Sequence, residues 1–171
     1  YIDDIREPAE CLHAALGLSP HACGHIVSLE LDAVRRAPGV ICVITAADCM
    51  GSNDIAPAFG DDELFARERV VYHGQPVFAV VAQTRMQARR AARLANIVIA
   101  ADVPVVTAQQ AASAGVRVLP DYDFFRGDVA HAYGQSALTL NGTFSIGGQE
   151  HFYLEGQAAL AVPGEGGDMH I

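Results

Sequence analysis

The stretch from Val77 to Ala100, VFAVVAQTRMQARRAARLANIVIA, places two apolar runs on either side of a helix-like pattern. The run over Val77–Ala82 has the length and β-branched content of a strand. Thr84 can accept a hydrogen bond from the first turn of a helix over Arg85–Ala95. Asn96–Ala100 predicts a second strand. Strand, helix and strand in this order indicate a mixed α/β domain.

A similar order occurs earlier in the chain. Gly24–Leu31 alternates between apolar and polar residues and predicts a strand. Asp32 is a plausible N-cap for a short helix that Pro38-Gly39 would end. Val40–Thr45 is a continuous β-branched run, which is typical of a strand buried on both faces. The short apolar run over Leu12–Leu16 predicts an extended segment or a short strand.

The other segments mix irregular and regular patterns. Ala46–Arg69 is a long polar connection that contains the apolar pair Leu64-Phe65, which either lines a substrate path or packs as an ordinary loop. Thr107–Gln110 has the form of a capping box, for a helix that Gly115 would end. Strands are predicted over Leu138–Ser145 and Gln157–Val162.

The predicted helix over Arg85–Ala95 has two different faces. The inward side is expected to carry Met86, Ala91, Leu94 and Ala95. The arginines fall outside this stripe, and they form either a solvated face or a basic face that binds a partner. These arginines are Arg85, Arg89, Arg90 and Arg93.

Composition limits the classes of function. The formal net charge of −9 opposes binding to nucleic acid, and no apolar run approaches the roughly 20 residues that span a membrane. The four cysteines have no CxxC spacing, so buried, reduced thiols in a cytoplasmic protein are expected. The chain begins without Met and ends in a strand-like run, so we expect a piece of a longer polypeptide.

Two groups of side chains could carry chemistry by themselves. His21, Cys23 and His25 alternate and could converge on a metal, but no fourth ligand at zinc-motif spacing is evident. Asp121 with Asp123, or Glu150 with Glu155, could form carboxylate pairs, although solvated pairs are the commoner case. Neither group makes a complete active site.

The segment Ile146–Glu155, IGGQEHFYLE, combines two glycines with an amide, two carboxylates, a histidine and two aromatic residues. Gly147 and Gly148 have no Cβ, so another group can approach their backbone closely. The plain alternative is a glycine bulge between two strands. Gln149 directly follows the glycines.

These residues carry a resemblance to a known family. Gly147–Glu155 resembles the glycine-glutamine motif of the molybdenum hydroxylases, in the branch of xanthine dehydrogenase and aldehyde oxidase. Weaker matches follow the family's order along nearly the whole chain. These matches are Tyr1–Asp4, Ala37–Val40, Ile44–Asp48, Gly74–Val77 and Leu160–Pro163.

The resemblance implies an α+β fold: an α/β hammerhead domain over 1–115, a linker over 116–136, and the truncated start of a molybdopterin-binding domain over 137–171. It implies that the Gln149 amide donates a hydrogen bond to an oxygen ligand of the molybdenum and does not bind the metal directly. It also implies that Gly147 and Gly148 let the backbone pass close to the cofactor. No catalytic residue is expected within the chain, since the family's glutamate base lies downstream.

The implied activity is hydroxylation of hypoxanthine or xanthine with oxygen from water. Electrons would leave through iron–sulfur clusters and FAD, expected on a partner subunit, to NAD, and the full-length protein would be a hetero-oligomer. The chain alone is expected to bind no molybdenum and to be inactive. Two alternatives remain: an aldehyde oxidoreductase of the same family, and a non-catalytic structural or docking module.

Overall fold

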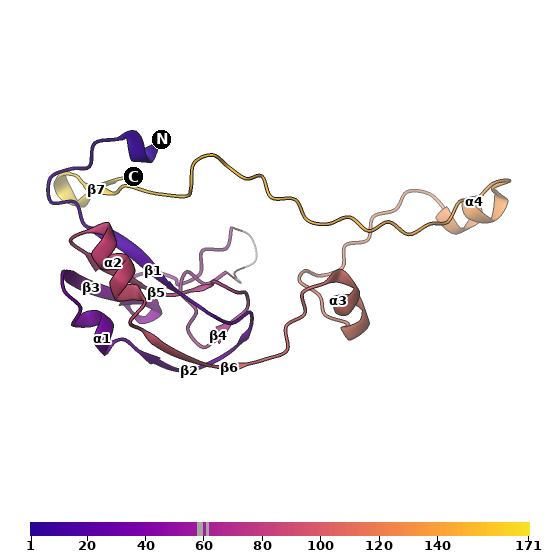
Figure 1. Ribbon diagram of the computed structural model, residues 1–171. Helices are drawn as coiled ribbons and strands as arrows, with labels where there is room; N and C mark the ends of the chain where they lie inside the picture. Colours follow the sequence, from indigo (N-terminus) through magenta and orange to yellow (C-terminus); the bar gives the residue numbers. More distant parts are fainter. Residues whose placement is uncertain (58–59, 61) are drawn as a thin grey trace. The chain divides into compact units, whose positions relative to one another are not determined.

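Strand β5 (Pro76–Ala82) lies at the centre of a three-stranded antiparallel sheet in the computed structural model, which describes residues 1–57, 60 and 62–171 (Figure 1). Its neighbours are β1 (His13–Leu18) on one edge and β3 (Val40–Thr45) on the other. Val77, Phe78 and Val80 are at most 1% exposed. Pairing on both edges and packing on both faces explain why the sequence of β5 is almost continuously apolar.

A second antiparallel sheet has the order β4-β2-β6. Its strands are β2 (Gly24–Glu30), β4 (Arg69–Val70) and β6 (Asn96–Ala101). Helix α1 (Asp32–Arg35) connects β2 to β3, and helix α2 (Arg85–Ala92) connects β5 to β6. Each helix therefore joins strands of two different sheets, and the two strand–helix–strand units form no parallel pair.

These elements belong to a unit of residues 7–110, and residues 1–6 with 111–171 form a second unit. The first unit has its own apolar core between the two sheets and the helices. The fully buried members of that core are Leu31, Val34, Ala66, Val70, Val77, Phe78, Val80 and Ala91. A smaller cluster contains Ala46, Phe65 and Ala79.

Helix α2 begins at the predicted cap, because the Thr84 hydroxyl accepts a hydrogen bond from the Gln87 N–H at 3.2 Å. It ends at Ala92 rather than at Ala95, and its buried residues are Ala88 and Ala91. The predicted inward positions of Met86 and Leu94 are wrong, since these side chains are 56% and 51% exposed. Alanine, with its short side chain, faces the core and brings the helix axis close to the sheet.

Strand β3 forms where predicted, but it is not buried on both faces. It is an edge strand that pairs only with β5 among the described residues, and Ile41 is 54% exposed. The register shifts between Val40 and Cys42, which is the sign of a bulge at this edge. A β-branched run favours a strand but does not determine the strand's place in the sheet.

Two smaller predictions also change. In α1 the N-cap is Leu31, and Asp32 is the first helical residue. The four cysteines form no disulfide, but they are not buried: Cys42 is exposed and the other three are half-buried.

The segment 46–69 is largely irregular, as predicted, apart from a 3-10 turn at Ala46–Asp48, an isolated bridge between Asp54 and Glu63, and Arg69, which begins β4. Positions 58, 59 and 61 of the predicted connection lie outside the described residues. Phe65 is only 5% exposed and packs against Ala46 and Ala79, whereas Leu64 is 38% exposed. Phe65 is thus a core residue of a packed loop and does not line a path at the surface.

The second unit has few regular elements. They are a 3-10 turn at Ile2–Asp4, α4 (Val129–Gln135), β7 (Val162–Pro163), a 3-10 turn at Glu165–Gly167 and β8 (Met169–His170). Helix α3 (Ala108–Ala114) crosses the boundary between the units and has the predicted cap, because Thr107 accepts from the Gln110 N–H at 3.1 Å. Gly115 ends it with a φ of +67°.

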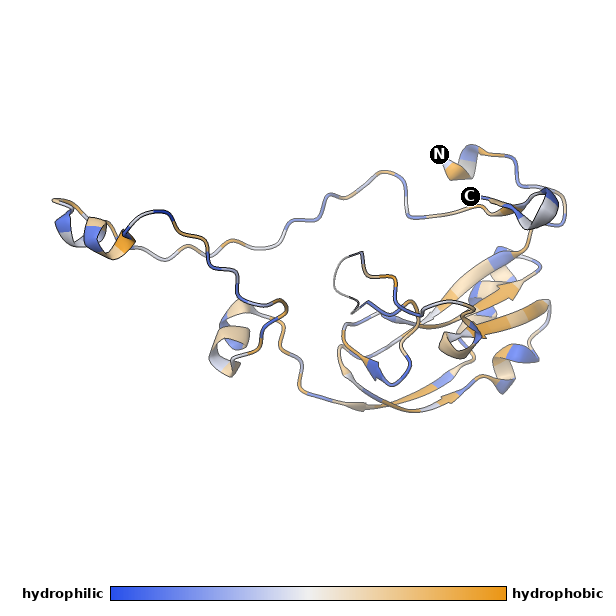
Figure 2. Cartoon of the chain, turned by 180° about the vertical axis from the view of Figure 1, so that it is seen from behind, coloured by the Kyte–Doolittle hydropathy of each residue, from blue (hydrophilic) through white to orange (hydrophobic). Residues whose placement is uncertain are grey.

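The strand predicted over Leu138–Ser145 is absent, and of the one predicted over Gln157–Val162 only Val162 is in a strand. A strand is stable only when another strand pairs with its backbone, and β7 with β8 is the one strand pair among the described residues of this unit. The alternating apolar residues stay uncovered: Leu140 is 86% and Phe144 is 90% exposed. Figure 2 shows hydrophobic residues recurring along this extended stretch.

Candidate functional site

Gly147, Gly148 and Gln149 lie in an extended, exposed segment with no regular secondary structure. Neither glycine has a positive φ, so the backbone here needs no left-handed conformation. A positive φ occurs later, at Phe152, which has a φ of +55°.

The residues after Gln149 interact locally. The Glu150 carboxylate accepts a hydrogen bond from the Phe152 N–H at 3.3 Å. The rings of His151 and Tyr153 stack with centroids 5.4 Å apart and an angle of 2° between their planes. Glu155 accepts a hydrogen bond from the N–H of Ile2. The histidine and both carboxylates therefore shape this segment and do not converge on one point.

The two glycines differ from Gly17 and Gly24 of the first unit in what surrounds them. A Cβ added at Gly17 would overlap the Phe78 ring, and one added at Gly24 would overlap the backbone of β6. No described atom lies within 4 Å of a Cβ added at Gly147 or Gly148. Packing within the described chain therefore does not require glycine at these two positions.

The Gln149 side chain suits contact with a cofactor oxygen. It is exposed, and its amide makes no hydrogen bond with any described residue. An amide N–H is a neutral donor, so it can orient an oxygen ligand without changing charge with pH. A neutral donor beside two glycines that leave the backbone open fits a molybdopterin cofactor.

The alternating group His21, Cys23 and His25 does not form a metal site. Among the described residues no three His, Cys, Asp or Glu side chains are grouped so that they could hold a metal ion. The Cys23 thiol donates instead to the carbonyl of Asp102 at 3.6 Å, and the His25 ring nitrogen lies 2.9 Å from the Arg69 guanidinium. Arg69 also forms an ion pair with Asp102 at 2.6 Å. These contacts join β2, β4 and the end of β6.

The carboxylates that the sequence suggested as pairs, Asp121 with Asp123 and Glu150 with Glu155, make separate contacts and form no joint acid–base site. Asp121 forms an ion pair with Arg117 at 3.0 Å, and both side chains are more than half exposed. Asp123 is also exposed.

Among the described residues, no helix is long and apolar enough to cross a membrane.

Two family models match the chain. Residues 1–101 match the model described as the a/b hammerhead domain of aldehyde oxidase and xanthine dehydrogenase. Residues 111–171 match the model of a molybdopterin cofactor-binding domain. The fold and these two matches thus define a molybdenum hydroxylase chain, with a hammerhead domain followed by cofactor-binding sequence.

Curated relatives align over almost the whole chain. A xanthine dehydrogenase from Dictyostelium discoideum is 32% identical and a xanthine dehydrogenase/oxidase from Gallus gallus is 37% identical, both over 100% of this chain. Aldehyde oxidase 2 from Mus musculus is 35% identical over 95% of this chain. The chain spans 12 to 13% of the length of these relatives.

Solved structures support the same grouping. Quinoline 2-oxidoreductase from Pseudomonas putida 86 is 31% identical with a TM-score of 0.56, and the similarity covers 67% of this chain and 15% of that chain. Carbon monoxide dehydrogenase from Oligotropha carboxidovorans is 30% identical with a TM-score of 0.57, and covers 64% of this chain and 14% of that chain. The chain belongs to the aldehyde oxidase and xanthine dehydrogenase family.

Proposed function

We propose that this chain is part of an oxidoreductase that hydroxylates a purine such as hypoxanthine or xanthine. The reaction would replace a C–H bond by C–OH with oxygen from water, and would release two electrons and two protons. Alignment of the whole chain with proteins named xanthine dehydrogenase supports a purine as the substrate. The similarity to aldehyde oxidase 2 makes an aldehyde the second candidate substrate.

Gln149, Gly148 and Gly147 would form one wall of the cofactor site. The observation that supports this assignment is the match of residues 111–171 to a molybdopterin cofactor-binding domain. No described atom lies within 4 Å of a Cβ added at Gly147 or Gly148, so the packing of the described chain does not require glycine there. Because glycine has no Cβ, the cofactor would approach the backbone of Gly147 and Gly148 closely. The Gln149 amide would donate a hydrogen bond to it. When bound, the molybdenum cofactor would supply the acceptor for the two electrons of the substrate.

The remaining parts of the machinery would lie outside residues 1–171. The proposed division is a hammerhead domain over 1–115, a linker over 116–136 and cofactor-binding sequence over 137–171. The base that takes the substrate's proton would come from elsewhere in the protein, and iron–sulfur clusters and FAD on a partner subunit would carry electrons to NAD. We therefore expect the 171-residue chain alone to bind no stoichiometric molybdenum and to leave hypoxanthine unchanged.

The test is Gln149→Ala in the complete enzyme, with molybdenum content measured beside turnover of hypoxanthine and of an aldehyde. Loss of an oriented donor beside a metal site costs about 10- to 100-fold in metal affinity or activity, so we expect a loss of that size with unchanged circular dichroism. Gln157→Ala is the matched control, because Gln157 is an exposed glutamine in the same segment. Equal effects of the two substitutions would remove Gln149 from the proposed role.

A further inference from the structure

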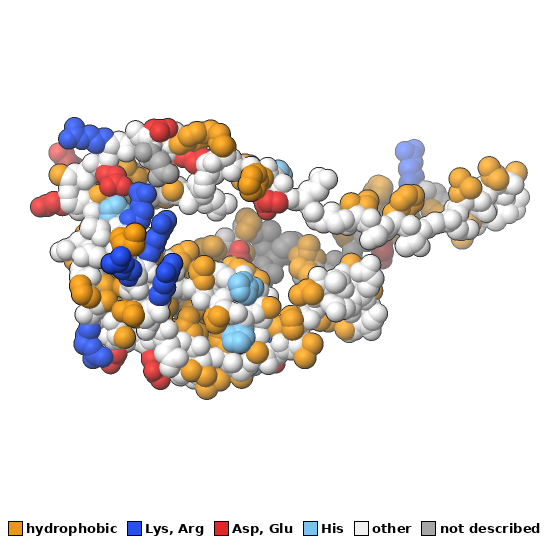
Figure 3. Space-filling view, in the orientation of Figure 1, with side chains coloured by type: hydrophobic (Ala, Val, Ile, Leu, Met, Phe, Trp, Pro, Cys, Tyr) orange, Lys and Arg blue, Asp and Glu red, His pale blue; other side chains and the backbone are white. Residues whose placement is uncertain are grey.

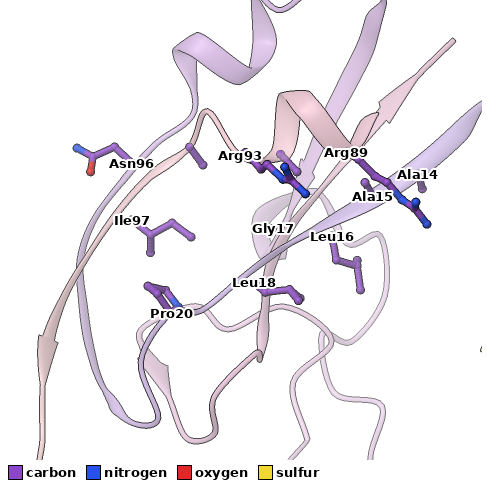
Figure 4. A pocket seen from close by; sticks show the side chains of 12 residues that line it. Ala14, Ala15, Leu16, Gly17, Leu18, Pro20, Arg89, Arg93, Asn96 and Ile97 are labelled. Atoms are coloured by element: carbon purple, nitrogen blue, oxygen red, sulfur yellow. The ribbon is translucent and has the colours of Figure 1, made fainter. Parts of the chain in front are cut away.

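An open groove of about 770 Å³ runs beside strand β1 within the first unit. Its lining includes the consecutive residues 14–18 of β1 together with Arg89, Arg93, Asn96 and Ile97, which Figure 4 labels. Successive side chains of a strand point to opposite faces. A groove lined by a continuous run of β1 residues therefore follows the edge of the strand rather than one of its faces.

The backbone along this edge is unpaired. Among the described residues β1 pairs only with β5, and β6 pairs only with β2. One row of N–H and C=O groups on β1 therefore has no strand partner. Such an edge can accept an additional strand from an extended peptide.

Apolar side chains lie along the same groove. Leu16 is 51% exposed and Leu18 is 49% exposed, and both belong to β1. Ile97 at the start of β6 is half-buried. A strand added here would cover these side chains as well as pair its backbone.

The groove also carries positive charge. Four of the eleven arginines of the chain lie between positions 85 and 93, and Figure 3 shows Arg side chains gathered over the region of α2. Arg89 and Arg93 are exposed, and neither forms an ion pair with any described residue. Arg85 differs, because it forms an ion pair with Glu7 at 3.0 Å. The two groove arginines are therefore available to an acidic partner, on a chain whose net charge is −9.

The same charges and the free edge disfavour other occupants. Pairing of β1 with β1 of a second copy would bring two sets of α2 arginines together, and like charges repel. A nucleic acid has no peptide N–H and C=O groups that pair with the free edge of β1 as an added strand does. We propose that the β1–α2 groove docks an extended acidic segment of a partner polypeptide, which adds a strand to the free edge of β1 and places carboxylates on Arg89 and Arg93.

A fluorescein-labelled peptide of alternating glutamate and valine, titrated against the 171-residue chain, tests this docking by fluorescence anisotropy. We expect saturable binding that weakens about fivefold in Arg89→Gln/Arg93→Gln, since each exposed charge pair contributes modestly. Arg90→Gln removes one positive charge from the same helix outside the groove, so it should change binding less than about twofold, and less than either Arg89→Gln or Arg93→Gln alone. Hydrogen exchange should show slower exchange of the backbone amides of residues 13–18 when the peptide is bound.

Four results would overturn the proposal: no saturable binding, equal loss in Arg90→Gln and the double variant, equal binding of an alternating lysine–valine peptide, or no added protection along β1. All three arginines are exposed, so the variants should keep the fold, and thermal unfolding checks this. A glutamate peptide with proline at alternate positions keeps the charge but cannot pair as a strand, and it should bind about as weakly as the double variant.

Discussion

The side chain of Asn53 pairs with the backbone of Phe65 as a second strand would. Its Oδ1 accepts a hydrogen bond from the Phe65 N–H at 3.1 Å, and its Nδ2 donates to the Phe65 carbonyl at 2.8 Å. The backbone continues this pairing, because the Leu64 N–H donates to the Asn53 carbonyl at 2.6 Å. These three hydrogen bonds explain how the irregular segment around Asn53 holds Phe65 in the core.

Asn53→Asp should destabilise the first unit, because a carboxylate keeps the acceptor but cannot donate to the Phe65 carbonyl. The hydrogen bond is partly buried, and loss of one partner of a buried hydrogen bond costs about 1–3 kcal/mol, so we expect a loss of about 1 kcal/mol, which urea unfolding measures. Asn141→Asp is the control: Asn141 also accepts a hydrogen bond, from Tyr133 at 3.2 Å, but in an exposed position. Similar losses in the two variants would contradict a special role for Asn53.

Gly17→Ala should also destabilise the first unit. A Cβ at this position would overlap the ring of Phe78, which is 0% exposed and cannot move aside without disturbing the core. Overpacking of this kind costs about 1–3 kcal/mol. Gly51→Ala serves as the control, because an added Cβ there meets no described atom within 4 Å.

Combining Gly17→Ala with Phe78→Leu tests the cause of that loss. If the overlap causes it, the double variant should lose less stability than the sum of the two single variants, since the smaller side chain makes room for the Cβ. Additive losses would show that the Phe78 ring is not responsible.

Thr84→Ala should lower the free energy of unfolding by about 1 kcal/mol, because it removes the N-cap of α2. This helix carries Ala88 and Ala91 into the core, so its fraying exposes apolar surface. Thr107 caps α3, which has no buried residue, and Thr107→Ala should change global stability by less than about 0.5 kcal/mol. Thermal unfolding measures the loss of stability in both variants. Equal losses in Thr84→Ala and Thr107→Ala would contradict the larger role of the α2 cap.

Asp48 should make stability depend on pH. The hydrogen bond from the Thr45 hydroxyl, at 2.7 Å, lowers the pKa of Asp48 below its ordinary value of 3.8, and the bond from the Thr45 N–H, at 2.8 Å, lowers it further. Because the folded-state pKa is the lower one, the carboxylate stabilises the fold above the unfolded-state pKa. That stabilisation is lost as the pH falls through the folded-state pKa.

We therefore expect the wild-type chain to be more stable than Asp48→Asn at about pH 7, with the difference shrinking below about pH 4. Chemical unfolding at a series of pH values measures it. Thr45→Val keeps the backbone bond and removes the hydroxyl, so its pH dependence should be smaller than that of the wild type. A constant difference between wild type and Asp48→Asn across the range would exclude this role.

Local chemistry was enough to predict many elements of the first unit. The Thr84 and Thr107 caps lie where the sequence places them, and the runs that became β2, β3, β5 and β6 are strands within one or two residues at their ends. Caps and β-branched runs act through neighbours in sequence, so they can be recognised without the fold. The glycine-glutamine motif likewise indicates the family, because it is a run of consecutive residues.

Tertiary pairing decided the rest, because the partners are far apart in sequence. The sequence of β3 suggested a buried strand, yet pairing made β5 the central strand and left β3 on an edge. Leu138–Ser145 alternates as a strand should, but its backbone has no partner within the described residues and stays extended. Only the fold brings the free edge of β1 beside Arg89 and Arg93, which makes a solvated helix face part of a groove. Alternation and charge can be recognised along the chain, whereas pairing and burial depend on which distant segments meet.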